Sequence, residues 1–185
     1  MNTFDLKSVI TDLESDSTEA QVLAIEAATE IVNNLVEKAL ETFQRSPDRL
    51  FIAERLANFG VAIVAPLEKL TNDSNNLEVI ILASLVLLQL GSKVGVRKLL
   101  DAFLESDDYA CLIARHMVKA NIDGFGDNIV TRLRLCEIEQ DKFIVCLLEE
   151  LKKLNYDLPS DLYSRFSDSH VSADIQYVVR NFNKN

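Results

Sequence analysis

Residues 77–90 are the most continuously apolar stretch of the chain, and Gly91 closes it. Because apolar residues fill almost every position, the stretch lacks the polar face of a surface helix. It is too short to cross a bilayer, which takes about 20 apolar residues. Its leucines and the glycine that follows favour a helix that neighbours cover on most sides. We therefore expect a buried helix here, with other helices around it.

The first 46 residues predict two more helices. Residues 4–14 form a short amphipathic helix whose apolar side consists of Phe4, Leu6, Val9, Ile10 and Leu13. Ser17 or Thr18 can cap a second helix that runs to about Gln44.

The second helix carries two apolar stripes, which implies contacts on two sides. One stripe consists of Val22, Ile25, Thr29, Val32, Val36, Leu40 and Phe43. The helix is either continuous or broken near Asn33 and Asn34, because asparagine is a poor helix former. Pro47 suits the first position of the helix that follows.

From about residue 50 the chain repeats a unit of two helices joined by a tight turn. Each first helix is expected to end at a Gly or Asn, the residue types that tolerate the left-handed conformation closing many helices. These end points are Gly60, Gly91, Asn121 and Asn155, which are 31, 30 and 34 residues apart. Such a period is typical of an α-solenoid, where each helix pair buries its apolar face against the next pair.

The clearest unit, residues 77–105, pairs an Ala-x-x-x-Leu-x-x-Leu-Gly helix with a Leu-Leu-x-x-Phe-Leu helix. It resembles a short HEAT repeat of the type found in phycobilisome lyases and in many bacterial helical-repeat proteins. The resemblance covers about residues 50–168. The Asp-x-x-Val-Arg segment common in such repeats is absent, and Asn76-Leu77-Glu78-Val79-Ile80 stands in its place.

Together, the period and the resemblance imply an all-α protein, an α-solenoid or right-handed superhelix of antiparallel helix pairs with helical caps. We expect one domain over residues 1–185. Within it, residues 1–46 form an N-terminal cap, residues 47–168 about four HEAT-like pairs, and residues 169–185 a C-terminal cap helix.

The charge balance narrows the class of partner. The net charge is -10, with 11 acidic and 5 basic side chains in residues 1–60 and 18 and 14 in residues 61–185. Because the whole chain repels phosphate, we expect no nucleic acid partner. The short apolar helices likewise predict no membrane partner.

Cysteine usage and the N-terminus favour a reducing compartment. Cys111, Cys136 and Cys146 are an odd number, widely spaced among apolar neighbours, which suits reduced core thiols better than disulfides or a metal site. The first residues lack the positive region and apolar run of a signal peptide. We expect a cytoplasmic protein.

No set of residues with catalytic or metal-ligand spacing emerges. His116 has no coordinating residue one helical turn away, and Cys111 lies five positions from it, well round the helix. His170 lies near a predicted turn and is likewise read as structural. The glycine-rich segment Asp123–Asn128 could cradle a phosphate, but a turn is expected where the repeat needs one. We therefore expect no enzyme activity, no cofactor and no metal.

A row of basic residues in the second helices is the candidate binding site. Lys93, Arg97 and Lys98 lie in one repeat, and Arg132 and Arg134 in the next. In solenoids, second helices usually line the concave surface, where partners bind. A basic strip would suit an acidic peptide or the acidic face of a protein, although these charges could equally solvate ordinary helices.

The leading functional hypothesis is a non-enzymatic protein–protein interaction module, a scaffold or adaptor that binds a protein or peptide. An immunity-type inhibitor would need the same kind of surface. The alternative, implied by the resemblance to lyases, is a ligand-handling or chaperone-like protein in which Tyr109 and His116 share a helix face. Self-association through the apolar N-terminal helices is a further expectation.

Overall fold

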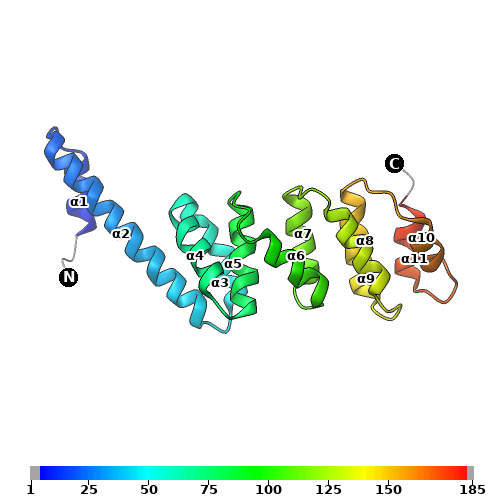
Figure 1. Cartoon of the computed structure of the whole chain (residues 1–185). Coiled ribbons are helices and arrows are strands. Elements are labelled where there is room, and N and C mark those ends of the chain that lie inside the picture. Colours follow the sequence, from blue (N-terminus) through cyan, green and yellow to red (C-terminus); the bar gives the residue numbers. More distant parts are fainter. Residues whose placement is uncertain (1–4, 183–185) are drawn as a thin grey trace. The chain divides into compact units, whose positions relative to one another are not determined.

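The computed structural model describes residues 5–182, which form α-helices and one 3-10 segment and contain no strand (Figure 1). The prediction of an all-α protein is therefore confirmed. Phe4 of the first predicted helix and residues 183–185 of the predicted C-terminal cap lie outside the described residues. The chain divides into two compact units, residues 1–90 and 91–185, and each is described by itself. The single domain and its cap and repeat boundaries stay predictions.

The first unit begins with a helical hairpin. Helix α1 (Leu6–Leu13) is capped by Asp5, whose carboxylate accepts a hydrogen bond from the Lys7 amide. Helix α2 (Thr18–Arg45) is capped by Ser17 and continues through Asn33 and Asn34 without a break. Of the two alternatives left by the sequence, the continuous helix is correct. Val9 of α1 packs on the small residues Ala24 and Ala27 of α2, and this contact holds the hairpin together.

Three further helices and a 3-10 segment complete the first unit. They are α3 (Arg49–Leu56), η1 (Ala57–Ile63), α4 (Val64–Asp73) and α5 (Leu77–Gln89). The helix after Pro47 begins two residues later than predicted, because Asp48 is the residue before its first turn. Helix α5 contacts both α3 and α4.

Helix α5 confirms the buried helix predicted at residues 77–90. Asn76 caps it by accepting a hydrogen bond from the Val79 amide. The side chains from Ile81 to Leu88 are all buried, and Leu87 is fully buried. Its burial on every side accounts for the missing polar face.

One stretch of the described chain, Arg49–Asp73, is long and apolar enough to cross a membrane by length and composition. It is not a continuous α-helix, because Gly60 adopts the non-helical angles φ 59° and ψ -136° inside η1. The longest α-helix within it is α4 with 10 residues, whereas a membrane span takes about 20. We interpret the stretch as two short helices that share α5 as a neighbour, and the expected absence of a membrane partner stays a prediction.

The second unit consists of six helices within the described residues. They are α6 (Val96–Glu105), α7 (Ala110–Lys119), α8 (Phe125–Leu135), α9 (Asp141–Lys153), α10 (Ser160–Phe166) and α11 (Ala173–Arg180). Helix α9 contacts both α7 and α11, and α8 contacts α6, so that alternate helices along the chain lie beside each other. The core between them includes Phe103 and Phe125, whose ring centroids are 5.1 Å apart.

All four predicted helix end points have the positive φ that their residue types indicated. Gly91, Asn121 and Asn155 each follow the C-cap of a helix, whereas Gly60 lies inside η1. The φ angles are 59° at Gly60, 87° at Gly91, 49° at Asn121 and 51° at Asn155. A substituent on Cβ is unfavourable at such angles, and Gly and Asn bear the conformation best. The positive φ expected at these four residues is therefore confirmed, whereas the repeat itself stays a prediction.

Candidate protein-binding surface

The apolar stripe of α2 is covered along one half and open along the other. In the second half, Val36, Leu40 and Phe43 are 3%, 8% and 0% exposed, because α3, η1 and α4 pack against this part of α2. In the first half, Val22, Ile25 and Val32 are 49%, 57% and 40% exposed. We call the stripe residues 22–32 the open stripe.

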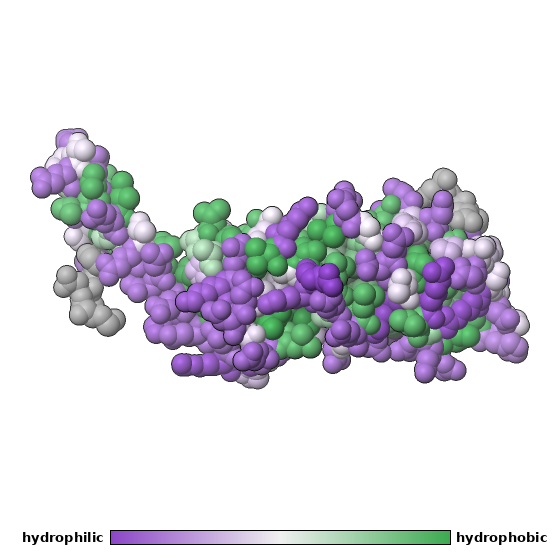
Figure 2. Space-filling view, viewed as in Figure 1, coloured by the Kyte–Doolittle hydropathy of each residue, from purple (hydrophilic) through white to green (hydrophobic). Residues whose placement is uncertain are grey.

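Helix α1 does not cover the open stripe, because it occupies another face of α2. That face carries Ala24 and Ala27, with Ala28 and Ile31 at its margin. Helix α1 adds exposed apolar residues of its own, Leu6, Ile10 and Leu13. Figure 2 shows hydrophobic surface on this hairpin beside hydrophilic surface further along α2. Exposed apolar area of this extent is typical of interaction sites.

A groove of about 610 Å³ lies between α2 and α4, next to the open stripe. Val36 and Leu40 of α2 and Pro66 and Leu70 of α4 supply its apolar lining. Its charged lining residues are Glu37, Glu41, Lys69 and Asp73. The open stripe leads along α2 into this groove, since Val36 follows Val32 by one helical turn.

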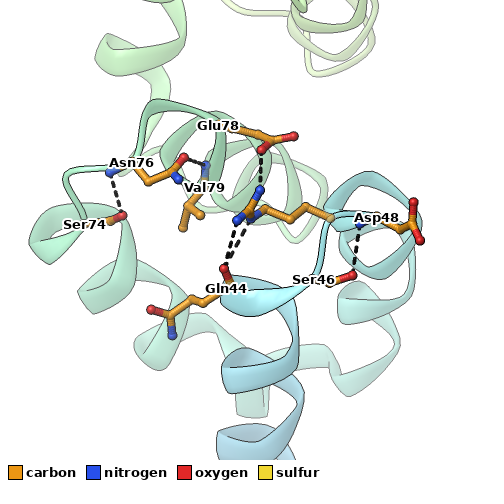
Figure 3. Close-up of polar contacts among 8 residues, drawn as sticks. Gln44, Ser46, Asp48, Ser74, Asn76, Glu78 and Val79 are labelled. Carbon is orange, nitrogen blue, oxygen red and sulfur yellow. Dashed lines mark hydrogen bonds and ion pairs between the residues drawn. The ribbon is translucent and has the colours of Figure 1, made fainter.

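A clip at the α2–α3 junction fixes the covered half of α2 to the rest of its unit (Figure 3). The Arg49 guanidinium donates hydrogen bonds to the Gln44 carbonyl at 3.1 and 3.3 Å, and to the Glu78 carboxylate of α5 at 2.6 Å. Cationic groups at a helix C-terminus satisfy its free carbonyls and complement its dipole. The clip therefore ties the end of α2 to the start of α5.

The predicted basic strip is taken up largely by contacts within the chain. Lys93 lies in the turn before α6 and not in the second helix, so that its predicted place was wrong. Arg97 and Lys98 lie on α6, where Arg97 pairs with Asp101 at 3.1 Å. Arg134 on α8 pairs with Asp161 at 2.9 Å, and this hydrogen bond raises the pKa of Arg134 above its ordinary value.

Arg132 is a structural clamp. Its guanidinium donates to the Leu104 carbonyl at the end of α6, at 2.6 Å, and to the Asp107 carboxylate. It also lies 5.6 Å from the ring centroid of Phe143, and its side chain is only 12% exposed. Helices α6 and α8 are in contact, which brings Arg97, Lys98, Arg132 and Arg134 onto neighbouring helices. Their predicted role in partner binding stays a prediction.

Arg165 forms the same kind of clamp one predicted repeat later, within the second unit. It donates to the carbonyls of Leu133, Arg134 and Cys136 at the end of α8. Arg132 and Arg165 are 33 residues apart, which falls within the predicted repeat spacing. The clamping role of Arg132 and Arg165 was not predicted from the sequence, although their spacing could have revealed it.

The three cysteines are free thiols of the second unit. Cys136 and Cys146 are buried, and burial raises the pKa of the Cys136 thiol to about 11. A hydrogen bond from Cys146 lowers the pKa of Cys111 and raises that of Cys146. The expected core position is confirmed for Cys136 and Cys146, whereas Cys111 is partly exposed, and the reduced state of the three thiols stays a prediction.

His116 and the glycine-rich segment are the remaining candidates. His116 is partly buried, which lowers its pKa, and within residues 5–182 no three potential ligands gather to hold a metal ion. In the glycine-rich segment, Gly124 has φ 71°. A Cβ on Gly126 would collide with the ring of Tyr156, whose hydroxyl donates to Asp127. Asp123 and Gly124 form the turn preferred from the sequence, and residues 125–128 form the start of α8, against which Tyr156 packs.

No family model, curated protein or solved structure matches this chain.

Proposed function

We propose that this protein is a non-enzymatic protein-binding module, built of HEAT-like helix pairs, that holds a protein partner on the open stripe of α2. The observation that carries the proposal is the half-covered stripe. The same run of apolar residues is 0–8% exposed at Val36, Leu40 and Phe43, and 40–57% exposed at Val22, Ile25 and Val32. A helix with one packed face, one packed end and one open apolar face has the form of a docking element.

Two features support the HEAT-like part of the proposal. The C-caps of helices α5, α7 and α9 are followed by Gly91, Asn121 and Asn155, which have positive φ and lie 30 and 34 residues apart. The Arg132 and Arg165 clamps join successive second helices, α6 to α8 and α8 to α10. In a solenoid, each pair is stabilised by such contacts with its neighbour. The stacking of these pairs into a superhelix is part of the proposal.

The alternative function, ligand handling of the lyase type, has less support. Its expected groups, Tyr109 and His116, do not line the α2–α4 groove, which contains neither a tyrosine nor a histidine in its lining. Tyr109 precedes α7 in a left-handed conformation, with φ 62°. The polar lining of the groove consists of three carboxylates, one lysine and the amides of Asn33 and Gln44, without the tyrosine and histidine that the alternative names.

Capture of partners from cells that make the protein tests the proposal. The baits are the wild type, the open-stripe variant Ile25→Asp/Val32→Asp, and the control Leu135→Asp, which changes an exposed leucine of the second unit. We expect the wild type and the control to retain the same proteins at the same level, and the open-stripe variant to lose them. Equal retention by all three baits would overturn the proposal, provided circular dichroism shows all three folded.

A further inference from the structure

The open stripe is bordered along one edge by glutamates. Helix α2 carries Glu19, Glu26, Glu30, Glu37 and Glu41. At 3.6 residues per turn, these five positions fall within about 60° of one another, and that edge lies about 110° around the helix from the stripe. The edge continues into the α2–α4 groove, which Glu37 and Glu41 help to line. We call these five residues the glutamate edge.

Within residues 5–182, Glu41 is the one member of the glutamate edge that forms an ion pair, although Lys69 lines the groove with Glu37 and Glu41. Lys38 donates to Glu41 at 2.9 Å and lowers the pKa of that carboxyl group. Glu26, Glu30 and Glu37 are exposed and form no ion pair with any described residue. Residues 5–37 contain eight acidic side chains and one basic one, Lys7, so that their net charge is -7. The hairpin that carries the open stripe is therefore strongly negative.

This charge decides between the possible occupants. A second copy of the chain would bring glutamates toward glutamates, and like charges facing each other across an interface are costly. A membrane surface is also disfavoured, because cytoplasmic leaflets carry negative lipids. A partner with an apolar face bordered by lysine or arginine would satisfy both the stripe and its edge.

We propose that the open stripe, the glutamate edge and the α2–α4 groove together bind a basic amphipathic helix of another protein. The mode is a helix laid along an apolar surface, with anchors spaced one helical turn apart. From Val22 to Leu40 the surface is about 27 Å long at 1.5 Å per residue, which matches a partner helix of about 18 residues. Its cations face the glutamate edge, and its apolar anchors reach Pro66 and Leu70, the partly exposed apolar residues of the groove. This inference rests on the proposed function and specifies the partner.

The test uses two synthetic peptides of about 18 residues that are amphipathic as helices, one of leucine and lysine, the other of leucine and glutamate. Binding to the full-length protein is followed by fluorescence anisotropy at low and high salt. One variant, Glu26→Gln/Glu30→Gln/Glu37→Gln, neutralises the edge. A matched control, Glu139→Gln/Glu149→Gln/Asp174→Asn, removes the same charge from exposed positions of the second unit.

The wild type is expected to bind the lysine peptide and not the glutamate peptide, with affinity falling as salt rises. Neutralising the edge should weaken binding about tenfold, and the control less than about twofold. Ile25→Asp/Val32→Asp should weaken it too, because the apolar anchors are lost. An equal loss in the two charge variants would overturn the proposal, since net charge alone would then explain binding.

Two further outcomes separate this inference from the proposed function. In one outcome, Ile25→Asp/Val32→Asp loses the captured proteins while the edge variant, and the wild type at high salt, still retain them. In that case the protein-binding function stands and the basic helix is wrong. If sedimentation velocity finds a dimer that Ile25→Asp dissociates, a second copy is the occupant, and the basic helix is again wrong. If every variant binds the captured proteins and the lysine peptide as well as the wild type does, both proposals are contradicted.

Discussion

The two halves of α2 carry one apolar stripe, yet one half belongs to a core and the other faces solvent. Phe43 is fully buried, whereas Ile25, on the same stripe, is 57% exposed. The difference lies in the neighbours, because α3, η1 and α4 pack on the second half and α1 sits on another face of the first half. The same sequence pattern therefore supports stability in one place and, we propose, recognition in the other.

The largest expected contrast uses the same substitution in a core helix and on the open stripe. Leu87→Asp would place an unpaired carboxylate at a fully buried site of α5, where charge is costly. We expect it to abolish the cooperative thermal transition measured by circular dichroism. Ile25→Asp should leave that transition near the wild-type temperature, because its carboxylate remains in water. A near-normal melt for Leu87→Asp would contradict our account of the core.

Truncations to alanine compare the two halves of α2 directly. Phe43→Ala should lower the free energy of unfolding by about 3–5 kcal/mol, through lost burial and the cavity it leaves. Val32→Ala should change it by no more than about 0.5 kcal/mol, as is usual for exposed positions. Urea denaturation of both variants measures the difference. Equal losses would mean that the open stripe is covered in the isolated protein.

The smallest contrast concerns the clip that holds the covered half in place. Arg49→Met removes the hydrogen bonds to Gln44 and Glu78 but keeps much of the side-chain volume. Because both partners of the Arg49–Glu78 pair are mostly buried, we expect a loss of about 1–3 kcal/mol in urea denaturation. Arg97→Met, which breaks an exposed pair with Asp101, is the control and should have no measurable effect. Equal effects would show that the clip contributes no more than a surface pair.

The sequence was sufficient for features that depend on neighbouring residues. The stripe of α2 could be read from its spacing, the buried α5 from its composition, and the left-handed ends from Gly60, Gly91, Asn121 and Asn155. Each of these follows from the helical period or from the backbone preference of one residue type. None of them requires knowledge of which helices meet.

Features that depend on distant residues could not be predicted. Whether Ile25 or Phe43 is covered depends on the turn at Ser46–Asp48, after which the chain returns to place α4 beside the end of α2. The basic residues Arg132 and Arg134 looked available for a partner, but their acceptors Asp107 and Asp161 lie 25 and 27 residues away. The α2–α4 groove was missed for the same reason, because it exists only where two separate helices meet.

Site-specific photo-crosslinking in the producing cells tests the central claim most directly. Benzoylphenylalanine is placed at position 25 in the open stripe and, in a separate variant, at position 135, which is 67% exposed in the second unit. The account predicts that irradiation yields a covalent adduct with a protein partner from position 25 and none from position 135. Adducts from position 135 alone, or equally from both, would contradict the assignment of the open stripe as the binding surface.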